Sequence, residues 1–171
     1  VFWALDLAGQ LIGLQMGLSF AVFYDPTNAT QTPIVSNFLG LLAMLIFLGL
    51  DGHLLILALL AESFTLLPVA LTPFAVKGYA VGLAWAATIF SSGVLLALPL
   101  IAALLIANIA MGVLSRVAPT LNLFAVGFPV PLFAGFLVLL ISLPYMSAAL
   151  QRLVEQAFGV MRLVMKAAGG A

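Results

Sequence analysis

Two long stretches of the chain contain no charged side chain. They cover residues 78–115 and 117–151, and each exceeds the roughly 20 residues that a helix needs to cross a bilayer. The whole chain is 65% hydrophobic and only 6% charged, whereas a soluble domain is about 25% charged. A globule of this size could not bury so much apolar surface. The sequence therefore predicts an all-α, polytopic membrane protein built from helical hairpins.

Charge and composition exclude several classes of function. Five basic and five acidic residues cancel, so there is no basic surface for nucleic acid. The chain has no cysteine, and its single histidine, His53, cannot form a multi-histidine metal site. The sequence also lacks the phosphate-binding loop, the serine elbow and the zinc-binding helix motif of common enzymes. We therefore expect no enzyme activity, no metal, no cofactor and no nucleic-acid partner.

The first apolar segment, residues 5–24, carries a stripe of small residues. Gly9, Gly13 and Gly17 recur every four residues, so one face of a helix would have no side chains, and another backbone could approach it closely. The stripe predicts close helix packing but does not name the partner. Two alternatives remain open: a helix of the same chain, or a helix of another subunit.

A polar loop follows this segment. It contains two prolines and no long apolar residue, which is typical of a loop rather than a helix. Its residues are Asp25, Pro26, Thr27, Asn28, Ala29, Thr30, Gln31, Thr32 and Pro33.

The second apolar region, residues 34–71, is interrupted near its middle by Asp51, Gly52 and His53. A charged aspartate at the centre of a bilayer costs about 3 kcal/mol on insertion scales, so we expect a bend or hairpin tip here that places these groups at an interface. An alternative hypothesis is an intramembrane proton relay made of Asp51, His53 and Glu62.

The two longest apolar runs are predicted to form helices interrupted by proline and glycine. Residues 82–114 should form a long, bent helix, because Pro99 removes a backbone hydrogen bond within it. Residues 121–149 should be broken near Pro129 and again near Pro144. Irregular backbone at membrane depth requires surrounding protein, so these breaks predict a chain buried among others.

The tail, residues 150–166, has an apolar face and a polar face and is predicted to be an amphipathic helix lying at the membrane interface. Three of the five basic residues lie in it, and the positive-inside rule therefore places the C-terminus in the cytoplasm.

Several motifs together resemble the FliR family of bacterial flagellar export proteins, in the family's order and approximate spacing. They cover nearly the whole chain. They include Gly13-Leu-Gln-Met-Gly-Leu-Ser-Phe20, Asp25-Pro26, Asp51-Gly-His-Leu54, Asn108 with Gly112, the family turn Arg116-Val-Ala-Pro119, and Gly127-Phe-Pro129.

The resemblance implies that residues 1–171 form a single export-gate domain, equivalent to the C-terminal two-thirds of a family member whose further N-terminal helices are missing here. Such a subunit would join FliP-like and FliQ-like gate subunits and an FlhB-like switch protein in the bacterial inner membrane, at the flagellar basal body. It would form the pore and gate through which unfolded flagellar proteins are exported. The other hypotheses are the homologous gate subunit of a virulence injectisome and a small-solute or proton transporter.

The resemblance also assigns a role to the polar loop. The segment that starts at Phe23 and Tyr24 and ends at Pro33 is similar in position to the family's plug, which closes the pore. From the residues alone, a plain exposed turn is the simpler interpretation.

Overall fold

The computed structural model describes residues 1–18, 22–25, 30–67, 76–118, 127 and 129–169. Within them the chain is helical, apart from one short β-hairpin. The elements in chain order are α1 (Phe2–Gln15), β1 (Val22–Asp25), β2 (Thr30–Pro33), α2 (Ile34–Gly49), α3 (Gly52–Leu66), α4 (Val76–Val117) and α6 (Pro129–Ala168).

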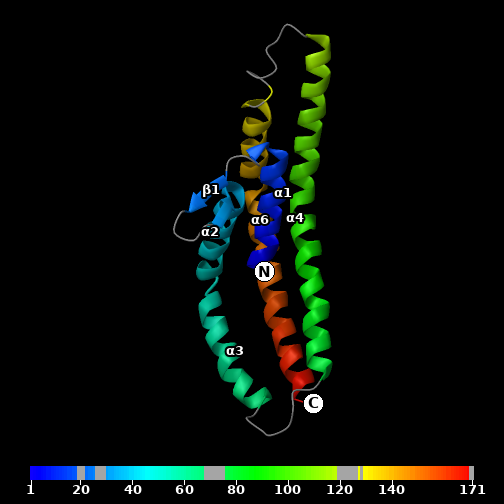
Figure 1. The fold of residues 1–171 in the computed structure, drawn as a ribbon. Coiled ribbons are helices and arrows are strands. Elements are labelled where there is room, and N and C mark those ends of the chain that lie inside the picture. The colour runs from blue at the N-terminus through cyan, green and yellow to red at the C-terminus, as the bar shows by residue number, and fades with distance from the viewer. Residues whose placement is uncertain (19–21, 26–29, 68–75, 119–126, 128, 170–171) are drawn as a thin grey trace.

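The molecule is an elongated bundle (Figure 1). The helices α4 and α6 run side by side in opposite directions, and α1 packs against both α4 and α2. Two helices, α4 and α6, are long and apolar enough to cross a membrane, and the bent pair α2 and α3 would add a third span. The predicted helical membrane fold is confirmed.

Helix α1 supplies the centre of the core. Its side chains Leu5, Ala8 and Ile12 are almost completely buried. They belong to one cluster of buried residues that also includes residues of α2, α4 and α6. These are Leu39 and Ala43 of α2, Leu96, Leu100 and Leu104 of α4, and Leu139, Leu150 and Val154 of α6.

The first helix is shorter than the sequence predicts. It ends at Gln15 rather than near Tyr24, because Gly17 adopts a φ of 78°, a left-handed conformation that ends helices. Tyr24 lies in β1 instead.

The break between α2 and α3 is confirmed as a bend of 67°. It is not a hairpin tip, since the chain continues in a new direction rather than reversing. Asp51 sits at the break with a φ of 54°.

The predicted break near Pro144 is wrong, whereas the predicted break near Pro129 coincides with the start of α6, and residues 119–126 and 128 before it lie outside the described part of the chain. Helix α6 begins at Pro129 and continues unbroken through Pro131 and Pro144 into the tail. The first two prolines fall in the first turn, where backbone N–H groups have no helical partner in any case. Next to Pro144, the hydroxyl of Ser147 donates to the Pro144 carbonyl at 2.8 Å. Helix α4 likewise continues through Pro99.

The amphipathic tail is therefore the second half of α6. Its apolar side chains Leu150, Val154 and Ala157 are buried against protein, while Arg152, Glu155, Gln156, Arg162 and Lys166 are exposed. The two-faced pattern is confirmed. The first part of the face that was expected to lie on lipid is instead covered by the bundle, whereas Met161, further along the same face, is 46% exposed.

Candidate gate and helix-packing site

The polar loop forms a β-hairpin directly after α1. Strands β1 and β2 pair antiparallel, with Phe23 opposite Thr32, Tyr24 opposite Gln31, and Asp25 opposite Thr30. Pro26, Thr27 and Asn28, at the predicted tip, lie outside the described residues. The two ends of the predicted plug, residues 22–25 and 30–33, thus lie side by side as paired strands.

Helical residues precede and follow the hairpin in the chain, and residues 19–21, between α1 and β1, lie outside the described residues. Before it, the backbone N–H of Gly17 donates to the Leu14 carbonyl at 3.1 Å, which closes the end of α1. After it, Pro33 is both the last residue of β2 and the N-cap of α2. No flexible linker separates β2 from α2, so the position of the hairpin depends on how α1 and α2 pack together.

The glycine stripe makes this packing close. Gly9 lies so near the backbone of Ser36 that an added methyl group would overlap it, and a methyl on Gly13 would meet the Val35 side chain at 3.6 Å. In this structure, the partner of the stripe is therefore α2 of the same chain. Gly17 lies beyond the end of α1 and does not continue the stripe; its role is the left-handed turn.

Three hydrogen bonds that the sequence reasoning missed also involve α1. The hydroxyl of Ser36, which is only 2% exposed, donates to Asp6, and the Gln10 amide donates to the same carboxylate at 2.9 Å. At the other end of α1, the Asn108 amide donates to the Gln15 carbonyl at 3.4 Å. The sequence did offer one indication of the contact between Asp6 and Ser36. Asp6 is the only charged residue in the first helical segment, and a charged group there needs a polar partner.

The polar bend does not form a cluster with Glu62. Asp51 and His53 are exposed on either side of the buried Gly52. Glu62 lies nine residues after His53, about 14 Å further along the α3 axis, where its carboxylate accepts a hydrogen bond from Arg162 of α6 at 2.9 Å. Among the described residues, no group of three acidic, histidine or cysteine side chains could hold a metal ion.

The residues of the family turn lie near the connection between the two long helices. Arg116 is in the last turn of α4, and Pro129 starts α6. Gly127 is described just before α6, whereas Pro119 lies outside the described residues.

These features define a class of protein: a helical membrane protein in which a short hairpin connects a buried central helix to the next helix. The chain belongs to the bacterial export proteins, family 1, because the sequence model of that family matches residues 1–157. The resemblance to FliR is thereby confirmed.

The curated relatives carry the name flagellar biosynthetic protein FliR. The relative from Pectobacterium carotovorum is 43% identical over 94% of this chain and 61% of its own length. Those from Escherichia coli and Aquifex aeolicus are each 38% identical over 94% of this chain, and over 61% and 62% of their own lengths. The chain thus spans less than two thirds of the relatives it matches.

Proposed function

We propose that this chain is a pore and gate subunit of the bacterial flagellar type III protein-export apparatus. The observation that carries the proposal is the 43% identity to a protein named FliR, over almost the whole of this chain. In this role the chain has no catalytic site. It works in the inner membrane at the flagellar basal body with FliP-like, FliQ-like and FlhB-like partners, and unfolded flagellar proteins pass through the assembly.

Within this function, the hairpin of β1 and β2 is the gate. A two-stranded hairpin alone is only marginally stable in water, so moving it costs little. Its direct connection to α2, which packs closely against α1, gives it a fixed base. A gate must also be held weakly, since a reversal from 1:99 to 99:1 between closed and open states already requires about 5.5 kcal/mol of differential binding.

Deleting residues 27–31 tests this assignment. The complex should still assemble, because the close packing of Gly9 and Gly13 lies outside the deletion, but it should leak small ions. The measurement is ion conductance in vesicles that carry the purified complex, together with the mass of the complex.

A matched variant replaces residues 27–31 with a glycine-serine segment of equal length. It keeps the length of the loop and removes its side chains. If the complex with the deletion conducts ions and the complex with the glycine-serine segment does not, the length of the loop closes the pore without its side chains. An assembled deletion complex that remains ion-tight would place the seal elsewhere.

The transporter hypothesis requires Asp51 and His53, in the polar bend, to take up and release protons. We expect Asp51→Asn and His53→Gln to leave protein secretion within about twofold of the unmodified chain, because both replacements keep hydrogen-bonding ability while removing charge or titration. Secretion of a flagellar substrate into the medium is the readout. Normal assembly with secretion abolished in both variants would favour proton transfer at Asp51 and His53.

A further inference from the structure

The outward side of α1 lies between two grooves. Helix α1 packs against α2 and α4 (Figure 1). The groove toward α2 has a volume of about 620 Å³, and the groove toward α4 has a volume of about 250 Å³. Trp3, Asp6 and Gln10 line both grooves, because residues three and four apart lie on the same face of a helix. These three residues, the α1 ridge, therefore separate the two grooves.

Asp6 is the acidic group of the α1 ridge, and no cation of this chain balances it among the described side chains. Its carboxylate accepts hydrogen bonds from two neutral donors, the Ser36 hydroxyl and the Gln10 amide. The one ion pair in the described part of the chain joins Arg162 to Glu62. A carboxylate offers about four acceptor positions, so Asp6 can still accept hydrogen bonds from a further donor.

The side chains around Asp6 are apolar and exposed. Trp3 is 75% exposed, Met44 in the groove toward α2 is 52% exposed, and Phe90 in the groove toward α4 is 68% exposed. Gly40 also lines the groove toward α2, and a methyl group added to it would meet no atom within 4 Å, so a neighbour can approach α2 closely here. Extended apolar patches of this kind mark interaction surfaces.

The charge of Asp6 restricts what can cover this surface. An apolar neighbour would remove water from the carboxylate, and burying a carboxylate is costly unless it is paired with a cation. A lysine or arginine in the neighbour supplies both the cation and the hydrogen-bond donors. A helix suits the apolar part of the contact, because it satisfies its own backbone polar groups while its side chains pack.

We propose that the α1 ridge and its two grooves form the docking surface for an apolar helix of another subunit, and that this helix carries a lysine or arginine that pairs with Asp6. The apolar face of the helix packs on Trp3 and fills the open space over Gly40. The surface has such a partner only if the chain works in an assembly of several subunits, as its proposed function requires.

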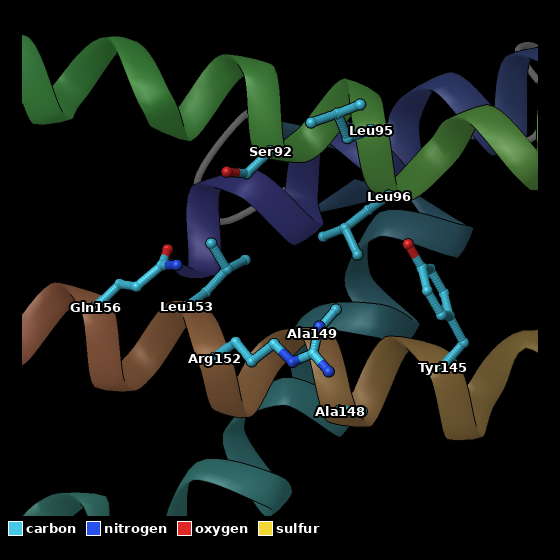
Figure 2. A pocket seen from close by; sticks show the side chains of 9 residues that line it. All are labelled: Ser92, Leu95, Leu96, Tyr145, Ala148, Ala149, Arg152, Leu153 and Gln156. Atoms are coloured by element: carbon cyan, nitrogen blue, oxygen red, sulfur yellow. The ribbon is translucent and has the colours of Figure 1, made fainter.

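The groove between α4 and α6 presents the opposite charge. In Figure 2, Arg152 projects from α6 among the residues that line this groove, which include Leu95 and Tyr145. A helix whose basic side chain suits Asp6 would meet a like charge there, which disfavours binding. The two grooves therefore differ in the partner that they accept, and Arg152 provides a control for the charge of Asp6.

A photo-crosslinking amino acid in place of Trp3 tests the surface. Benzoylphenylalanine, introduced through the chromosomal gene, keeps an aromatic side chain on the α1 ridge. Mass spectrometry of the crosslinked peptides should identify an apolar segment of another subunit. That segment should carry a lysine or arginine within about two helical turns of the crosslinked residue, since Trp3 and Asp6 are about one turn apart.

Reversing the charge at Asp6 should displace this helix. In the crosslinking background, Asp6→Arg should lower the yield of the crosslink at least about tenfold, because loss of one partner of a close charge pair costs a factor of this size or more. Asp6→Asn should lower it by a smaller factor. Asparagine still accepts the hydrogen bond from Ser36, so this variant separates loss of the ion pair from unfolding.

A charge exchange gives the decisive comparison. Replacing the identified lysine or arginine by aspartate should restore the crosslink of the Asp6→Arg variant to within about twofold of the unmodified yield, because the pair is re-formed with its charges exchanged. Glu155→Gln and Arg152→Gln each remove one exposed charge outside the α1 ridge, and both should keep the yield unchanged. Equal losses in these controls would mean that surface charge in general holds the helix, and would overturn the proposal.

Other occupants of the surface would also overturn the proposal. These outcomes are a crosslink only to lipid, a crosslink to this chain itself, a crosslinked segment without lysine or arginine, and an unchanged yield in Asp6→Arg. The mass of the purified complex separates them from a failure of the proposed function. An intact complex with any of these outcomes refutes the docking surface alone, whereas a chain that purifies without any partner refutes both.

Discussion

At the scale of single residues, Gly9 and Gly13 on the same face of α1 meet very different surroundings. A methyl group on Gly9 would overlap the backbone of Ser36, which cannot move without displacing α2, whereas a methyl on Gly13 would make an ordinary contact with Val35 at 3.6 Å. Both glycines lie within α1, four residues apart. They therefore offer a matched pair for measuring how closely the two helices must approach.

We expect Gly9→Ala to destabilise the protein by about 1–3 kcal/mol, the usual cost of overpacking a core. Gly13→Ala should be neutral or slightly stabilising, because alanine favours a helix by about 1 kcal/mol over glycine. The measurement is the midpoint of thermal unfolding in detergent, followed by circular dichroism. Equal midpoints for the two variants would show that α1 and α2 are not packed this closely.

At the scale of elements, α3 is the least supported helix. Only Gly52 among its residues is buried, and its contacts are few compared with those of α1. Beyond the 67° bend, the Glu62–Arg162 pair links it to α6. Both side chains are exposed by at least a third, so the pair contributes at most about 1 kcal/mol.

Glu62→Gln should therefore raise the hydrogen-exchange rate of amides in α3 by up to about fivefold, and leave those of α1 unchanged. Local opening of a weakly packed helix gives this selective response. Mass spectrometry of the exchanged peptides is the readout. Glu155→Gln, which removes an acidic group with no ion-pair partner among the described side chains, serves as the control. Equal rates in the two variants would mean that the ion pair does not hold α3.

At the scale of the whole molecule, the bundle leaves much apolar surface uncovered. Large side chains such as Leu57 on α3, Ile106 on α4 and Phe133 on α6 are each at least 60% exposed. Lipid can cover part of this surface, and partner subunits would cover the rest. We expect a particle purified in mild detergent to have a protein mass well above the 17.9 kDa of this chain, measured by native mass spectrometry. A monodisperse, folded monomer would contradict this.

The sequence by itself determined the helical membrane class and the positions of the long helices. The charge-free runs do this locally, because a chain in lipid must satisfy its own backbone hydrogen bonds, and a helix does so within one segment. The interruption at Asp51 and the two faces of residues 150–166 could also be predicted from the sequence, since each depends on the order of polar and apolar residues along one segment.

Only the tertiary structure decided the end of α1, the pairing of the hairpin and the continuity of α6. The glycine stripe predicted close packing, but whether its partner was α2 or another chain depended on a contact between Gly9 and Ser36 across the bundle. The Asp6–Ser36 hydrogen bond likewise joins residues 30 positions apart. Local pattern cannot specify such pairs, because their free energy exists only once the two helices have met.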